Sequence, residues 1–162
     1  MVGTPRKRIT LALTAFALAA CAPAATVNQQ TAMPMDAATL EMRANTSLSW
    51  GDMTPPGFSP GMKIAVLHGD PGASGDYTIR LSFPDGYRFP AHWHPGGEHV
   101  TVLSGTFLLS MVTTGGVSAE RAYVPGDFLY IPGRNPHSGG ASGATVIQLH
   151  GIGPFAINLG TP

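Results

Sequence analysis

The chain has 162 residues, a length typical of one domain, and contains 21 Gly, 15 Pro and a single Cys. Its formal net charge is zero and it has no basic run, so we expect no nucleic-acid partner. One cysteine excludes an internal disulfide and a cysteine-based zinc cluster, so any metal site has to use histidine and carboxylate ligands.

The N-terminal segment has the pattern of an export signal. Arg6, Lys7 and Arg8 precede twelve uncharged, mostly apolar residues, 9–20. That length is typical of a signal-peptide core and is shorter than the about 20 residues of a membrane-spanning helix. We therefore predict that residues 1–20 are a signal peptide and that the mature chain acts outside the cytoplasm.

The end of this segment resembles a bacterial lipobox, in the residues Leu18-Ala19-Ala20-Cys21. The resemblance implies that Cys21 receives a lipid and becomes the new N-terminus, which would make the lipid anchor the protein's contact with the membrane. In a Gram-negative cell, Ala22 implies the outer membrane. Ordinary secretion to a soluble periplasmic form is the alternative, because small-x-small cleavage sites also occur here. Residues 21–46, rich in Ala, Pro, Thr and Gln, are predicted to be a flexible tether.

The remainder, residues 47–162, reads as one all-β domain. Short apolar or alternating segments are separated by Gly- and Pro-containing turns, which is typical of a sandwich or barrel. The strands are predicted at residues 63–67, 77–83, 88–94, 98–103, 106–112, 121–124, 128–131, 145–150 and 155–159.

The densest group of polar residues lies around His92. His92 and His94 are two apart on a predicted strand, so both imidazoles leave the same face. After Pro95-Gly96-Gly97, Glu98 opens the next strand and can point back toward them, whereas its neighbour His99 points to the other face. Such a set of nitrogen and oxygen ligands suits a metal ion. The alternative is a pair of polar histidines on a strand with no metal.

These residues resemble the two motifs of the cupin superfamily. The first motif is matched at all its positions by Gly86, His92, His94, Glu98 and Gly105. The second is matched by Gly126, Pro132 and His137. Arg134 stands where the motif has Gly and Ala141 where it has Asn, and both departures concern turns and not ligands. The resemblance implies a single jelly-roll β-barrel, and it also implies that such barrels pair as homodimers.

The resemblance further implies four ligands, His92, His94, Glu98 and His137. They would bind one divalent transition metal ion, which can be Mn, Fe, Ni, Cu, Co or Zn, since ligand type alone does not choose among them. An octahedral ion held by four ligands keeps two positions open.

Four other residues are candidates for the pocket beside the metal. Phe107 and Met111 alternate on one strand and would form an apolar wall, although core packing is their simpler role. Gln148 and His150 share a face of a later strand and would support the ligands from the pocket, with a position at the rim as the alternative.

The sequence leaves three functions open. The first is a metal-dependent, dioxygenase-like oxidoreductase that acts on a small molecule in the cell envelope. The second is a non-catalytic module that binds a metal or a small ligand. The third is a structural lipoprotein with a vestigial site, which the retention of all four ligands disfavours.

Overall fold

The computed structural model describes residues 41–162, which lie within one compact unit, Leu40–Pro162. The predicted signal segment, Cys21 and most of the predicted tether lie outside the described residues. A short 3-10 turn, η2 (Asn45–Ser47), comes before the strands. These are β1 (Gly51–Asp52), β2 (Lys63–His68), β3 (Gly75–Phe83), β4 (Arg88–Trp93), β5 (Glu98–Thr113), β6 (Gly116–Val117), β7 (Arg121–Tyr123), β8 (Phe128–Ile131), β9 (His137–Gly153) and β10 (Asn158–Leu159).

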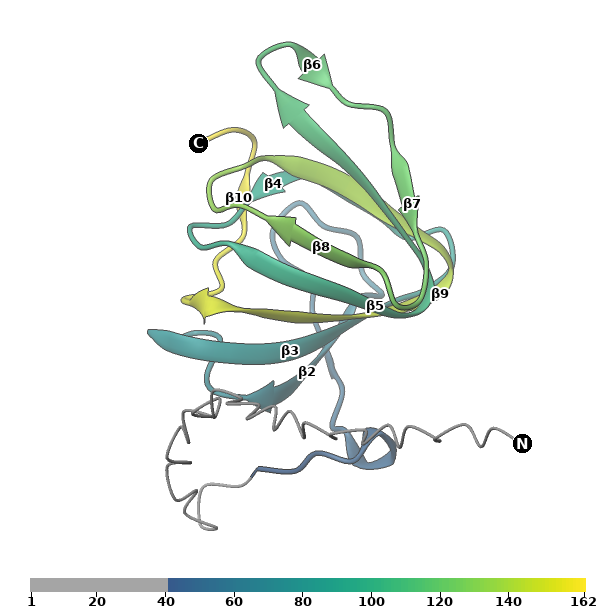
Figure 1. Ribbon diagram of the computed structural model, residues 1–162, viewed down its shortest axis with the longest axis vertical. Coiled ribbons are helices and arrows are strands. Elements are labelled where there is room, and N and C mark those ends of the chain that lie inside the picture. The colour runs from purple at the N-terminus through teal and green to yellow at the C-terminus, as the bar shows by residue number, and fades with distance from the viewer. Residues whose placement is uncertain (1–40) are drawn as a thin grey trace, which may run out of the picture. The chain divides into compact units, whose positions relative to one another are not determined.

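Two long strands, β5 and β9, pair with each other along most of their length and organise the sheet. The first part of β9 also pairs with β4, and its second part pairs with β3. Beyond these, β3 continues to β2 and β1, β4 continues to β10, and β5 pairs with β6, β7 and β8. The sheet therefore curls around an interior (Figure 1), and the prediction of an all-β jelly roll is confirmed.

Alternation along the strands decides what faces the interior. In β3, Tyr77, Ile79, Leu81 and Phe83 are buried while the residues between them are half-buried, as the period-2 pattern predicts. The same faces of β5 and β9 contribute the buried residues Val100, Val102, Ile147 and Leu149. Burial of these apolar side chains is the main stabilisation of the fold.

β5 is one bent strand where two separate strands were predicted. Residues 98–103 and 106–112 were expected to form two strands, but they form one strand whose register with β9 shifts around Ser104 and Gly105. Gly105 has a φ of 73°, which glycine adopts at little cost. The fully buried Thr145 accepts a hydrogen bond from the Thr106 amide, 3.1 Å away, and so fixes the bend.

The first half of β9 was not predicted, because Ser138-Gly139-Gly140 has the composition of a loop. Two neighbouring backbones explain the glycines. A Cβ on Gly139 would lie 2.0 Å from the Leu108 carbonyl oxygen, and one on Gly140 would lie 2.1 Å from that of Tyr87. Glycine is thus required for close strand packing here.

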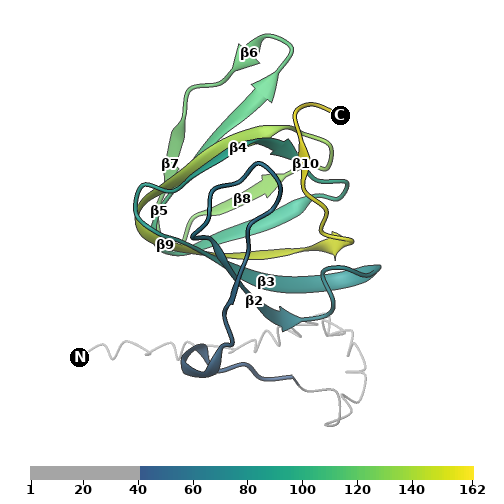
Figure 2. The same ribbon diagram turned by 180° about the vertical axis from the view of Figure 1, so that it is seen from behind.

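Two irregular segments cover the open side of the curled sheet. The segment between β1 and β2, drawn in blue, crosses the face seen in Figure 2, and its Phe58 and Met62 are buried in the core. The segment between β9 and β10 contributes Phe155 and Ile157. The strand predicted at residues 155–159 is therefore limited to β10. Among residues 41–162, no helix has the length and apolar character needed to cross a membrane.

Candidate metal centre

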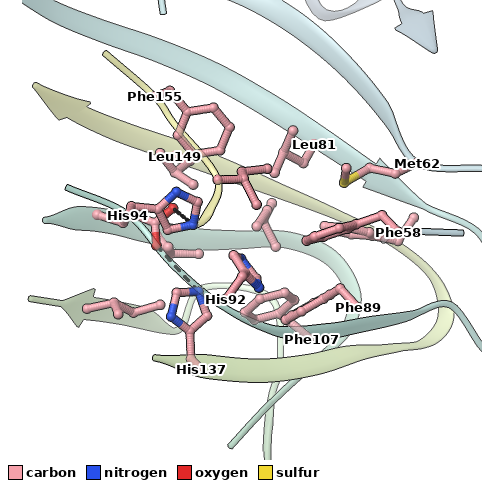
Figure 3. A pocket seen from close by; sticks show the side chains of 16 residues that line it. Phe58, Met62, Leu81, Phe89, His92, His94, Phe107, His137, Leu149 and Phe155 are labelled. Atoms are coloured by element: carbon pink, nitrogen blue, oxygen red, sulfur yellow. Dashed lines mark ion pairs between the residues drawn. The ribbon is translucent and has the colours of Figure 1, made fainter. Parts of the chain in front are cut away.

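Three buried histidines meet inside the curled sheet. His92 lies near the end of β4, His94 follows that strand, and His137 begins β9 directly opposite His92 in the β4–β9 register. One ring nitrogen from each lies within 4.8 Å of those from the other two, so the three are placed to hold a metal ion. Figure 3 shows the three imidazoles turned toward one another.

The Nδ1 atom of each imidazole is engaged by a backbone carbonyl. His92 Nδ1 lies 2.8 Å from Pro90 O, His94 Nδ1 lies 3.0 Å from Ala156 O, and His137 Nδ1 lies 3.0 Å from Asn135 O. Since a carbonyl oxygen can only accept, Nδ1 carries the proton and donates. The lone pair of each neutral ring is thereby left on Nε2, the arrangement expected of histidines that ligate a metal.

Glu98 lies beside two of these imidazoles. It begins β5 and is only 3% exposed. Its Oε1 lies 3.3 Å from His94 Nε2, and its Oε2 lies 3.6 Å from His137 Nε2. One carboxyl group thus faces the same Nε2 atoms that the backbone contacts leave open, and these donors suit a divalent transition metal ion.

Burial makes this cluster electrically neutral around pH 7 when no metal is bound. Loss of solvation lowers the pKa of His92 to about 4 and of His94 to about 3, with the neighbouring imidazoles adding to the effect, and it also lowers the pKa of His137. Burial raises the pKa of Glu98 to about 8. At neutral pH the imidazoles are therefore unprotonated and ready to bind metal, while Glu98 mostly holds a proton.

The histidines and Glu98 lie in a small, apolar cavity. The cavity has a volume of about 40 Å³, which suits a few waters or a small molecule. Phe58 approaches His92 edge-on at 5.1 Å between ring centres, and Phe155 stacks on His94 at 4.9 Å. The remaining walls are the apolar side chains of Met62, Leu81, Phe83, Phe89, Val100, Phe107, Ile131, Ile147, Leu149 and Ile157.

Of the four pocket residues predicted from the sequence, the structure places one at the cavity and three elsewhere. Phe107 lines the cavity. Met111 instead borders a separate hollow near β7 and β8. Gln148 and His150 point to the outer face of β9, where Gln148 accepts a hydrogen bond from Arg80 and His150 contacts Thr78. Alternation explains this outcome, because their neighbours Ile147 and Leu149 occupy the inner face.

Sequence reasoning missed the cavity residues from the two covering segments. Phe58 and Met62 lie in a segment without strand periodicity. Phe155 and Ile157 lie in the range 155–159, which was predicted as a strand but not as part of the pocket. The only available signal was an isolated aromatic residue in each of two Pro- and Gly-containing segments, which is too general to indicate a pocket.

Comparisons with known proteins agree with this architecture. The solved structure of the polyketide cyclase RemF from Streptomyces resistomycificus has a TM-score of 0.63 and 17% identity, covering 74% of this chain and 84% of that one. A cupin 2 conserved barrel domain protein from Rhodopseudomonas palustris has a TM-score of 0.59 and 14% identity, covering 76% and 87%. The DMSP lyase DddQ from Ruegeria pomeroyi DSS-3 has a TM-score of 0.55 and 22% identity, covering 70% and 61%.

These structural similarities show the fold, whereas the family is shown by a comparison of sequences. A search of curated proteins finds no match. The family model described as ChrR cupin-like domain matches residues 42–156, a range that contains the three histidines and Glu98. The chain therefore belongs to the ChrR cupin-like domain family.

Proposed function

We propose that His92, His94, Glu98 and His137 bind one divalent transition metal ion, and that the protein is a metal-dependent, dioxygenase-like oxidoreductase acting on a small, mostly apolar molecule. The observation that carries this proposal is the convergence of three Nε2 atoms and one carboxylate at a cavity with apolar walls. When bound, the metal would supply Lewis-acid or redox chemistry. Three of its ligands are neutral and one is anionic, so a divalent ion would retain positive charge.

The chain's own residues have separate tasks in this proposal. Three backbone carbonyls fix the tautomers of the imidazoles. Phe58 and Phe155 hold two of those rings in place and exclude water from them. The apolar walls would bind a small substrate by burial of its own apolar surface. The names of two structural neighbours, a polyketide cyclase and a DMSP lyase, support a small-molecule substrate for a barrel of this kind.

Elemental analysis is the first test. Mature protein is purified from the periplasm without added metal, beside a His92→Ala/His94→Ala variant. We expect roughly one first-row transition metal per chain in the parent and none in the variant. The loaded protein is then tested for dioxygen consumption with a panel of small apolar substrates. A parent that folds normally and contains no metal would remove this proposal.

One observation favours a second candidate, a non-catalytic binding module. Within the described residues, the cavity contains no acid, base or arginine beyond the three histidines and Glu98. A positioned proton donor or acceptor is a common mark of catalysis. Metal-loaded protein that binds small apolar molecules in a titration but consumes neither them nor dioxygen would establish this candidate.

We further propose that the protein is exported and anchored through Cys21. The support is the signal pattern of residues 1–20 and the lipobox-like residues before Cys21. Cells fed labelled palmitate should incorporate label into the parent and not into Cys21→Ser. A parent without label that is recovered from the soluble periplasm would instead establish ordinary secretion.

A further inference from the structure

A row of side chains crosses the outer face of the sheet, on the side away from the buried histidines. Each member is the direct register partner of the next on five neighbouring strands. We call this the outer row, and it consists of His68, Thr78, His150, His99 and Tyr130. Thr78 is half-buried and the other four residues are exposed. The row therefore presents three imidazoles to solvent.

Two of these imidazoles are close enough to share a ligand. His99 and His150 lie opposite each other on β5 and β9, and their ring centres are 6.1 Å apart. With metal–nitrogen distances of about 2.1 Å, two rings bound to one ion have centres about 5–6 Å apart. Both side chains are exposed, so a small rotation brings their nitrogens to a common ion.

The surroundings of the pair form a hollow of about 240 Å³, bordered by Gly97, Gly151, Tyr130 and Ile152 besides the two histidines. A Cβ on Gly97 would lie 2.8 Å from the Tyr130 hydroxyl oxygen, so the absence of a side chain allows the tyrosine ring to lie over this backbone. The same tyrosine ring packs 4.8 Å from that of His99. The hollow beside the two imidazoles leaves room for an ion and its waters.

Contacts with its neighbours orient His150. Thr78 Oγ1 lies 3.1 Å from His150 Nδ1, which engages that nitrogen and leaves Nε2 for a ligand. His68, the third histidine of the outer row, is differently placed. Its Nδ1 lies 3.0 Å from Glu41 Oε2 and its Nε2 lies 3.4 Å from Asp76 Oδ2, so both of its nitrogens already face carboxylates. Thr78 also separates it from His150.

From this placement we propose that His99 and His150 form a second binding site for a divalent transition metal ion, on the outer face of the barrel. Imidazole nitrogens suit Cu²⁺, Ni²⁺ and Zn²⁺, and water would complete the coordination. Two exposed ligands bind more weakly than the buried set, so the outer site fills after the inner one. The proposal is independent of the function proposed for the inner centre, because it uses none of its ligands.

The test is a Zn²⁺ titration of the full chain carrying Cys21→Ser, from which bound metal has first been removed with a chelator. The substitution removes the only thiol. We expect two classes of sites by calorimetry. His99→Ala and His150→Ala should each weaken the second class by at least about tenfold and leave the first unchanged, since losing a ligand costs no less than losing a supporting partner. The matched control is His68→Ala, another exposed histidine of the same row, which should leave both classes as in the parent.

A His92→Ala/His94→Ala variant should lose the first class and retain the second. If that variant fails to fold, the His99→Ala and His150→Ala titrations still decide, because they leave the interior intact. A parent whose only class of sites is lost in His92→Ala/His94→Ala would overturn the proposal. A second class of sites that persists in His99→Ala, or whose affinity falls equally in His68→Ala, would also overturn the proposal.

Discussion

Glu98 differs from the three histidines of the centre in its protonation state at pH 7. The three imidazoles of the centre are neutral at pH 7 and offer their lone pairs directly. The carboxyl of Glu98, with its pKa raised to about 8 by burial, has to give up a proton before it can bind a cation. The pH dependence of metal binding at neutral and mildly alkaline pH thus reports on Glu98.

We predict that metal affinity falls by about tenfold for each pH unit from pH 8 to about pH 6.5, because one proton competes at Glu98. At lower pH the slope should steepen as the three imidazoles take up protons, since burial lowers the pKa of His137 and lowers those of His92 and His94 to about 4 and 3. Titrations at several pH values measure the slope directly.

Glu98→Gln is the matched variant for this prediction. It keeps the size of the side chain but has no proton to release, so its affinity should be weaker at pH 8 and nearly constant from pH 8 to about pH 6.5. A slope that is the same in the variant and the parent would show that another group provides the proton.

At the scale of the elements, the bend shared by β5 and β9 depends on one hydroxyl. Thr145 is fully buried, and its hydroxyl accepts a hydrogen bond from the Thr106 amide at the shift of register. Thr145→Val keeps the shape and removes the acceptor. The expected loss in free energy of unfolding is about 1–2 kcal/mol, measured by urea denaturation. Thr145→Ser retains the hydroxyl and should retain the bend. A valine variant as stable as the parent would contradict this role.

The turn before β9 contains a departure from the cupin motif that has a structural effect. Arg134 replaces the expected glycine, yet it adopts the glycine-like φ of 60° while its amide donates to His94 O at 2.8 Å. Its guanidinium lies 5.1 Å from the centre of the Trp93 ring. That contact offsets part of the strain, since such contacts contribute about 0.5–1 kcal/mol at exposed sites.

Two substitutions separate strain from contact at Arg134. Arg134→Ala loses the Trp93 contact and keeps the strain, whereas Arg134→Gly loses the contact and relieves the strain. We therefore expect the glycine variant to be more stable than the alanine variant by about 1 kcal/mol. Thermal unfolding of both variants measures this difference, and equal stabilities would mean that the turn is unstrained.

The elements also show what a sequence can predict. The predicted strands match β3, β4 and β8 closely, and in β3 the alternation of apolar and polar residues arises because one face packs on the core. The early part of β9 was missed, because its glycines are explained by the Tyr87 and Leu108 backbones, which are distant in sequence. The histidines and Glu98 could be placed from local spacing and motif. Phe58 and Phe155 could not, since only tertiary packing brings them to His92 and His94.

At the scale of the whole domain, a bound ion would connect three strands through His92 on β4, Glu98 on β5 and His137 on β9. Binding to the folded state alone contributes about 4 kcal/mol when free metal is at about 1,000 times Kd. For a domain of this size, removal of the metal by a chelator should lower Tm by about 10 °C or more. Differential scanning calorimetry measures the change. His92→Ala/His94→Ala should show no response to the chelator, and an equal response would place the stabilising ion elsewhere.

The two covering segments have a consequence for how such a protein can diversify. Three of the four proposed ligands lie on regular strands and His94 directly follows one. Phe58 and Phe155, which contact His92 and His94, come from irregular segments outside the paired sheet. A Cβ on Gly57 would lie 2.7 Å from a methyl of Leu159 on β10, so the first covering segment packs closely against that strand. Mutation in these short stretches can reshape the cavity while the ligand-bearing strands stay the same. Selectivity and reactivity are thereby encoded in separate parts of the chain and can evolve independently.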